Sequence, residues 1–226
     1  MKYKTHLHAI IIIQILLSFT QSVFSNSHAS FEEKPNILWI TSEDNGPFLG
    51  CYGDEVAYTP HLNKLASKGV RYTHCFANAP VFAPVRISWI LGIPAITTGT
   101  FQMRSRYRVP GSLVPYPVLL QKAGYYVTNN SKTDYNTASF EKEIWNECGR
   151  NAHYKNRNEG QPFFAIFNIG FSHEGQIFEK HYPSKYPEAK TPANKIEVPP
   201  YQVKTEAVIR DWQRVYDRIA DMDKEV

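Results

Sequence analysis

The chain has 226 residues, and its 25 lysines and arginines against 21 aspartates and glutamates give a formal net charge of +4. This near balance, without a run of basic residues, excludes the nucleic-acid-binding class. The length suits one domain with a sizeable core, and an aromatic content of 14% indicates a folded chain. The three cysteines, Cys51, Cys75 and Cys148, fit no zinc motif, so we expect small core residues with at most one disulfide bond.

The N-terminus has the pattern of a signal peptide. Two lysines precede an apolar run from Ala9 to Phe19, which is shorter than the roughly 20 residues that a membrane-spanning helix needs. We predict that residues 1–29 are a signal peptide, cleaved after Ser25 or Ala29, and that residues 30–226 form the domain. The alternative is an uncleaved membrane anchor. In both cases we expect an exported protein, periplasmic or secreted, and cleavage would leave no stable membrane span.

The first strand signal is the apolar run from Ile37 to Thr41, which follows Asn36. A continuous apolar run predicts a central strand that is buried on both faces. Glu43 and Asp44 come directly after it. Two adjacent carboxylates repel each other, and ligands of parallel α/β sheets bind at the carboxyl ends of strands, so the pair predicts a cation site. The alternative is a pair of solvated loop acids.

A helix and a strand are predicted next. Thr59 suits an N-cap, Pro60 the first helical position and Gly69 the position past the helix end. The segment Val70–Phe76 alternates between apolar and polar residues, which predicts a strand. We therefore interpret His74 as a structural strand residue.

The segment from Asn78 to Arg86 contains two prolines and leads into the apolar run Ile87–Leu91. Proline fixes φ and disfavours the α region for the residue before it, so we predict an extended, rigid turn that opens into a short helix. Arg86 then lies in or just before the first helical turn. A cation there opposes the helix dipole, which is better explained if Arg86 contacts a bound anion. The alternative is an ordinary surface arginine.

Two further strands are predicted to end in polar residues. A short helix over Pro117–Gly124 precedes the β-prone run Tyr125–Thr128, and Lys132 lies just beyond that run. The apolar run Pro162–Ile169 predicts another buried strand, and His173 follows it. A solvated lysine and an ordinary loop histidine are the alternatives.

These strand ends predict one site. The alternation of strand and helix signals indicates an α/β fold with a mainly parallel, helix-flanked sheet. Because parallel strands end at the same edge, we expect Glu43, Asp44, Lys132 and His173 to meet there, with Arg86 beside them.

The C-terminal part contains one amphipathic helix. His181–Tyr201 is rich in proline and lysine and predicts an irregular crossing loop. A helix follows from about Thr205, with apolar residues at alternating spacings of four and three that are typical of core packing rather than a cofactor surface. These residues are Val208, Trp212, Val215, Ile219, Met222 and Val226.

The sequence Phe82-Ala83-Pro84-Val85-Arg86 resembles the signature of the type I sulfatases, which is Cys or Ser, any residue, Pro, any residue, Arg. In that family the Cys or Ser is oxidised to formylglycine, whose hydrated aldehyde attacks sulfur. Phe82 has neither a thiol nor a hydroxyl, so the nucleophile of the family is absent here. A third possibility keeps hydrolysis and uses Ser88 or Thr97 as the nucleophile.

Other segments carry the same resemblance. The pattern Pro-Asn, apolar strand, acid, Asp is similar to the opening of sulfatases, and it implies that Glu43 and Asp44 bind Ca²⁺, with Glu43 in place of the commoner Asp. The element Gly-Tyr-x-Thr with a following lysine implies that Lys132 contacts sulfate. His173 matches a sulfate-contacting histidine. Gln102 stands where a histidine commonly precedes the Met-Arg pair of the sulfamidase-like branch.

The resemblance implies the alkaline-phosphatase-like fold of sulfatases and covers their N-terminal part. In the family, the helix that matches residues 205–226 is followed by a strand with further metal ligands and by a smaller C-terminal domain, so the site is expected to be incomplete here. The implied function is hydrolysis of sulfate esters, on carbohydrate, with Arg86, Lys132 and His173 around the anion. Because Phe82 replaces the nucleophile, we expect this chain to be inactive. The alternatives are a pseudoenzyme that binds sulfated glycan and a truncated gene fragment.

Overall fold

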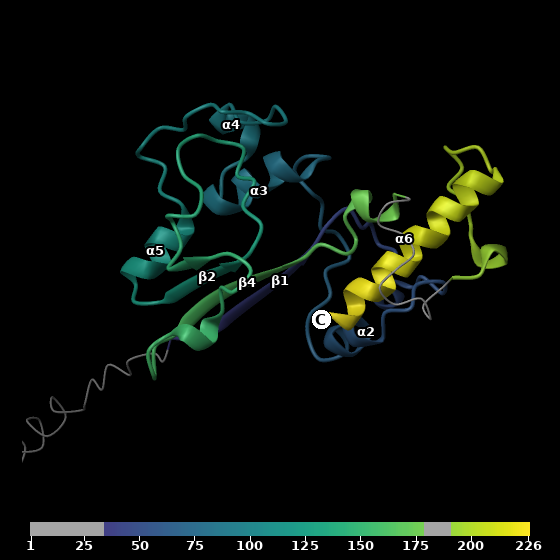
Figure 1. Ribbon diagram of the computed structural model, residues 1–226, viewed down its shortest axis with the longest axis horizontal. Coiled ribbons are helices and arrows are strands. Elements are labelled where there is room, and N and C mark those ends of the chain that lie inside the picture. Colours follow the sequence, from purple (N-terminus) through teal and green to yellow (C-terminus); the bar gives the residue numbers. More distant parts are fainter. Residues whose placement is uncertain (1–33, 179–190) are drawn as a thin grey trace, which may run out of the picture. The chain divides into compact units, whose positions relative to one another are not determined.

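The computed structural model describes residues 34–178 and 191–226, of which Asn36–Val226 form one compact unit (Figure 1). The predicted signal peptide and the first part of the predicted crossing loop lie outside the described residues. Within the described ranges, no helix is both long and apolar enough to cross a membrane.

The centre of the fold is a four-stranded sheet whose strands all pair in parallel. In chain order the strands are β1 (Ile37–Ser42), β2 (Tyr126–Asn130), β3 (Glu147–Cys148) and β4 (Phe163–Ile169). Their order across the sheet is β1-β4-β2-β3. The predicted parallel, helix-flanked α/β sheet is therefore confirmed.

The position of β1 corrects one prediction. Among the described strands β1 lies at the edge of the sheet and pairs with β4 alone, although its apolar run predicted a central strand. The Leu38 side chain is 52% exposed, while Trp39 packs against the core on the other face. An apolar run reports hydrophobic surroundings but carries no information on strand order, so the central position could not be derived from it.

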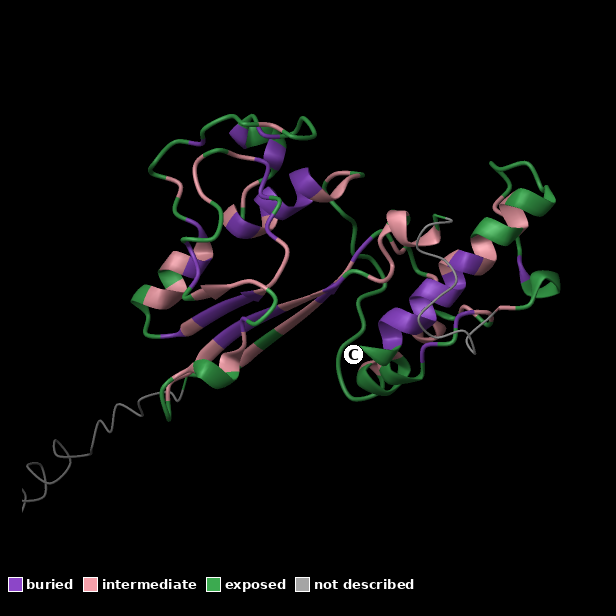
Figure 2. Cartoon of the chain, viewed as in Figure 1, coloured by how far each residue is buried: buried purple, intermediate pink, exposed green. Residues whose placement is uncertain are grey.

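Three helices cover one face of the sheet (Figures 1 and 2). They are α3 (Phe82–Leu91), α4 (Ala95–Thr98) and α5 (Tyr116–Lys122). Ile87 of α3 and Val127 of β2 are fully buried in the main core cluster, and Trp39 and Trp89 pack with ring centroids 5.3 Å apart. Burial of such side chains contributes about 1.5–3 kcal/mol each, which fixes α3 against the sheet.

Two further helices, α2 (Pro60–Ala66) and α6 (Glu206–Lys224), pack against each other. Thr205 caps α6, since its side chain accepts a hydrogen bond from the Val208 N–H. The predicted apolar stripe of α6 faces the core only in part: Ile219 and Met222 are each 1% exposed, whereas Val208, Trp212 and Val215 are half-buried and Val226 lies past the helix end. The remaining elements are short 3₁₀ helices: η1 (Gly50–Tyr52), η2 (Tyr154–Asn156), η3 (Glu174–Ile177) and η5 (Ala193–Lys195).

Two predictions for the segment after α2 were wrong. Residues 70–76 form no strand, and the side chains of Val70 and Phe76 are 84% and 86% exposed. The segment runs beside η1, where Tyr52 Oη donates to the Tyr72 carbonyl, and an alternating pattern does not by itself supply a neighbouring strand to pair with. Cys75 is exposed rather than part of the core, and Cys51, Cys75 and Cys148 are all free thiols.

Candidate functional site

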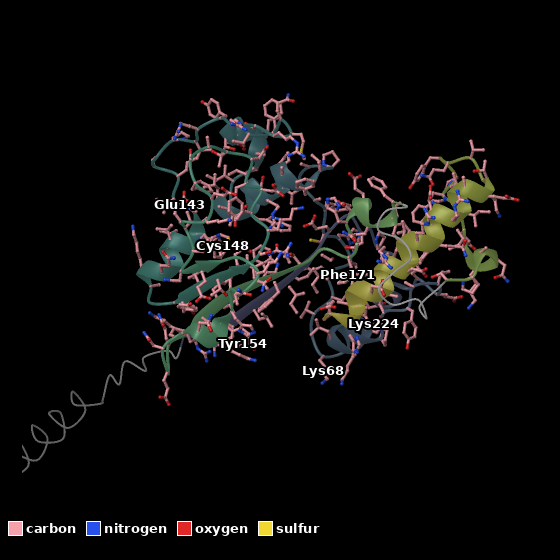
Figure 3. All side chains as sticks on the ribbon, in the orientation of Figure 1. Lys68, Glu143, Cys148, Tyr154, Phe171 and Lys224 are labelled. Atoms are coloured by element: carbon pink, nitrogen blue, oxygen red, sulfur yellow. The ribbon has the colours of Figure 1, made fainter. Side chains whose placement is uncertain are left out.

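The carboxyl ends of β1, β2 and β4 bring three charged side chains to one edge of the sheet. Glu43 follows β1 directly, Lys132 lies two residues after β2, and His173 lies four residues after β4. Figure 3 labels Cys148 at the end of β3 and Phe171 shortly after β4. The predicted convergence of the strand ends is therefore present in the structure.

Glu43 and Lys132 form a close ion pair. Lys132 Nζ lies 2.5 Å from Glu43 Oε2, and the Glu43 side chain is only 7% exposed. The backbone of Glu43 is fixed as well, because its N–H donates to Ser172 Oγ at 3.0 Å. Burying a carboxylate costs free energy unless a cation lies beside it, and here that cation is the ammonium of Lys132.

His173 faces the same carboxylate as a hydrogen donor. Its Nδ1 accepts a hydrogen bond from the Gly175 N–H at 3.1 Å, which places the hydrogen of a neutral ring on Nε2. Nε2 lies 4.0 Å from Glu43 Oε2. The ring is therefore arranged to donate to an anion rather than to offer a lone pair to a metal ion.

Asp44 supplies the second carboxylate. Its backbone has φ 53°, and its Oδ2 accepts a hydrogen bond from the Glu174 N–H at 2.8 Å. One potential ligand atom from each of Glu43, Asp44 and His173 lies within 4.8 Å of the others, so this cluster can hold a metal ion. Because the His173 lone pair is engaged by Gly175, the carboxylate oxygens are the fitting donors, and they suit a hard cation.

Arg86 lies deep in the fold and anchors the loop that carries Lys132. Arg86 is only 4% exposed. Its Nε donates to the Thr133 carbonyl at 2.8 Å. Its Nη2 donates to the Lys132 carbonyl at 2.6 Å and to Asn168 Oδ1 at 2.7 Å. Burial lowers the pKa of the guanidinium from its ordinary value. The alternative of a surface arginine is wrong.

The backbone around Arg86 also differs from the predicted extended turn. Helix α3 begins at Phe82, so Arg86 is its fifth residue and lies beyond the first turn. Pro84 is the third residue of the helix, a position where its missing N–H removes no helical hydrogen bond. The argument from the helix dipole therefore does not apply to Arg86.

Phe82 occupies the space between the two basic side chains. Lys132 Nζ lies 3.8 Å from the centre of the Phe82 ring, within the range of a cation–π contact, and the Phe82 and His173 ring centroids are 5.9 Å apart. Phe82 also lines two pockets of about 300 and 270 Å³. The larger pocket is bordered by Glu43, Asp44 and Arg86 as well. Lys132 and His173 thus lie against the Phe82 ring, and Glu43, Asp44 and Arg86 line a pocket together with it.

The two hydroxyl groups considered as replacement nucleophiles are placed elsewhere. Ser88 is 6% exposed, and its Oγ donates to the Pro84 carbonyl and accepts from the Ala95 N–H. Thr97 is exposed on α4. Ser88 therefore stabilises the junction of α3 and α4, which makes it unsuitable as a nucleophile.

Sequence reasoning missed two asparagines that connect these groups. Asn168 on β4 accepts from Arg86 Nη2 and donates to Asn129 Oδ1 at 2.8 Å, and Asn129 donates to the Lys132 carbonyl. Asn129 is completely buried. A polar residue within a buried strand must be hydrogen-bonded, and this is the signal that could have identified both.

Chemically, the site presents carboxylates, a lysine ammonium and a donating imidazole around one aromatic ring. The carboxylates can hold a cation, and the basic groups can bind a small anion. The position between them carries a benzyl group, which offers no oxygen or sulfur for attack on an electrophile.

Comparisons with known proteins identify relatives of the chain. A family model described as Sulfatase matches residues 35–154. An ulvan-active sulfatase of Formosa agariphila is 34% identical, with a match that covers 86% of this chain and 40% of the relative, and mouse iduronate 2-sulfatase is 36% identical over 43% of this chain and 18% of the relative. The chain therefore spans less than half the length of these curated relatives.

Solved structures show the same fold. A putative sulfatase of Bacteroides fragilis has a TM-score of 0.60 at 17% identity, over 85% of this chain and 57% of that chain. A protein solved with its substrate, D-glucosamine-2-N,6-O-disulfate, has a TM-score of 0.51 at 19% identity, over 60% of this chain and 34% of that chain.

Proposed function

The chain belongs to the sulfatase family, and from this premise we propose that it binds sulfate groups of carbohydrates at the Glu43–Lys132–His173 site without hydrolysing them by the formylglycine route. Family membership supports sulfate esters as the ligand class. The loss of catalysis is inferred from this chain's own residues.

The observation that carries the proposal is the position of Phe82. Its ring lies 3.8 Å from Lys132 Nζ and next to the His173 ring, where the signature of the family places its nucleophile. Removing the covalent nucleophile costs about 10⁶-fold in turnover in a well-studied serine protease. Binding depends on charge and hydrogen bonding instead, and those groups are retained.

Anion recognition is assigned to Lys132 and His173. Their side chains are 21% and 30% exposed, so an anion can reach them from solvent. Arg86 contributes indirectly, because it holds the Lys132 and Thr133 carbonyls and thereby sets the position of the lysine.

We assign a calcium ion to the carboxylates of Glu43 and Asp44. Oxygen donors and an irregular arrangement suit Ca²⁺, which takes about six to eight ligands. When bound, the ion would supply positive charge that attracts a sulfate oxygen. These two residues would hold only part of its coordination shell.

The carbohydrate ligand is inferred from the relatives. One relative is named for activity on ulvan, and one structural neighbour was solved with a disulfated glucosamine. Export through a signal peptide at residues 1–29, to the periplasm or beyond, would place the protein where such glycans occur. The ligand is therefore proposed to be an extracellular sulfated carbohydrate.

Calorimetry and sulfate release test the proposal together. A sulfated ulvan disaccharide is titrated into the protein, with its desulfated form as the ligand control, and free sulfate is measured over the same period. We expect binding of the sulfated form alone and no release of sulfate. Lys132→Ala should abolish binding, whereas Arg210→Gln, which removes an exposed charge on α6, should leave it unchanged. Sulfate release that disappears in Lys132→Ala would overturn the proposal and restore an enzyme.

A further inference from the structure

An extended segment between α4 and α5 is fixed along its length to the loop that follows Lys132. The Ser105 N–H donates to Asn136 Oδ1 at 2.7 Å, Thr137 Oγ1 donates to the Tyr107 carbonyl at 2.7 Å, and the Val109 N–H donates to Ser139 Oγ at 3.0 Å. The backbone at positions 105, 107 and 109 is therefore tied to residues 136–139.

Arginines lie between these anchored positions, at 106 and 108, and directly before the first of them, at 104. Arg104, Arg106 and Arg108 are all exposed, and Figure 2 shows much of the connection between α4 and α5 as exposed surface. Among residues 34–178 and 191–226, no ion pair, hydrogen bond or ring contact involves any of the three guanidinium groups. Alternate residues of an extended chain are about 6.6 Å apart and lie on the same side, which applies to Arg106 and Arg108. Arg104 lies in the preceding turn and lines the same pocket as Arg106. The three arginines thus form a strip, called here the arginine strip, on a backbone that is already ordered.

The arginine strip borders the candidate sulfate site. Arg104 and Arg106 line the pocket of about 270 Å³ that Phe82 also lines. The acids of this pocket have partners of their own: Asp134 Oδ2 lies 3.7 Å from Lys132 Nζ, and Glu141 Oε1 accepts from Thr133 Oγ1 at 3.0 Å. Arg104 and Arg106 are the two cations of this pocket.

We propose that the arginine strip is a second anion-binding subsite, which holds further sulfate or carboxylate groups of a linear anionic glycan while one sulfate lies at Lys132 and His173. This inference rests on the proposed function, since the same glycan joins both sites. Guanidinium groups bind planar and tetrahedral oxyanions with two parallel hydrogen bonds, and arginine is favoured over lysine for that purpose. The ligand class is therefore a polymeric sulfated glycan rather than an isolated sulfate ester.

Ligand length provides the test. Binding of ulvan disaccharide and of longer ulvan oligosaccharides is measured by calorimetry at several salt concentrations, in the wild type and in Arg106→Gln/Arg108→Gln. Arg104 is left in place because its φ of 61° makes substitution there a test of the backbone as well. Arg210→Gln is the matched control, since it removes an exposed arginine on α6, which contributes no residue to this pocket.

We expect the wild type to bind longer oligosaccharides more tightly than the disaccharide. The double variant should lose about tenfold in affinity for the longer ligands and bind the disaccharide as the wild type does. Its salt dependence should also be shallower, because fewer counterions are released. Arg210→Gln should behave like the wild type.

Three results would decide against parts of this scheme. Unchanged affinity of the double variant for long oligosaccharides would overturn the arginine strip while leaving the sulfate site intact. Equal binding of a single-stranded DNA of matched charge would show a general polyanion surface and overturn the glycan assignment. If neither the wild type nor the variants bind the disaccharide, but the wild type binds long oligosaccharides and the double variant does not, the proposed function is rejected. The arginine strip is then retained as a glycan site.

Discussion

At the scale of single residues, Arg86 links the stability of the fold to the geometry of the site. Its guanidinium satisfies the carbonyls of Lys132 and Thr133 and the side chain of Asn168, all within 2.8 Å. Those acceptors are far apart in sequence, so one side chain fixes the loop after β2 against β4. Arg86, the arginine of the signature-like segment, therefore positions Lys132.

We predict that Arg86→Met destabilises the protein by about 2–4 kcal/mol, because it leaves buried acceptors without donors. The measurement is urea unfolding followed by tryptophan fluorescence. Arg86→Lys should recover only part of the loss, since a lysine cannot reproduce the fork of donors. Arg210→Met, at an exposed position of α6, is the control and should change stability by less than about 0.5 kcal/mol. Equal stability of Arg86→Met and the wild type would contradict this role.

The limits of sequence reasoning are also visible at this scale. Glu43, Lys132 and His173 could be predicted to meet because each follows a strand that the sequence marks clearly. The two prolines predict an extended turn before Arg86, but the first turn of a helix also accommodates proline, and α3 begins at Phe82. Asn129 and Asn168 belong to no motif, and only the demand that buried amides be paired could have identified them.

At the scale of elements, the contact between α2 and α6 depends on one carboxylate. Asp223 is 1% exposed, and its two oxygens accept from the N–H groups of His61 and Leu62 in the first turn of α2. Thr59 holds the N-cap position but uses its hydroxyl elsewhere, as the acceptor of the Gly50 N–H. Asp223 therefore caps α2 from a helix more than 150 residues away in sequence.

We predict that Asp223→Ala lowers the free energy of unfolding by about 2–3 kcal/mol, through loss of the cap and of two charge-assisted hydrogen bonds. Urea unfolding measures the total, and hydrogen exchange should show reduced protection in α2. Arg210→Ala on the same helix is the control, because Arg210 is exposed. Equal losses in the two variants would refute a specific capping role.

Local sequence patterns predicted where helices and strands occur better than they predicted which segments pair with each other. The stripe of α6 and the polar ends of β1, β2 and β4 follow from periodicity and from turn residues. The edge position of β1 and the absence of a strand at residues 70–76 depend on which segments pair, and no local pattern contains that information. Alternation in residues 70–76 was equally compatible with an extended segment beside η1.

At the scale of the whole molecule, the cation site and the anion site share one group. Glu43 Oε2 lies 2.5 Å from Lys132 Nζ, and the same carboxylate belongs to the cluster that can hold a metal ion. A metal ion at Glu43 would weaken its hold on Lys132 and leave the ammonium available to sulfate. Conversely, a sulfate that draws Lys132 away would free the carboxylate. The two ligands are therefore coupled through a competition for Glu43.

We predict positive linkage between Ca²⁺ and a sulfated disaccharide. Calcium should raise disaccharide affinity by about 5- to 100-fold, and the disaccharide should raise calcium affinity by the same factor, because coupling of binding free energies is reciprocal. Calorimetric titrations of each ligand with and without the other measure both factors. Glu43→Gln should bind the disaccharide more tightly than the wild type in the absence of calcium, since Lys132 loses its competing partner, and should lose the response to calcium. Equal affinities with and without calcium in the wild type, or weaker disaccharide binding in Glu43→Gln, would show that the ion pair does not govern access to Lys132.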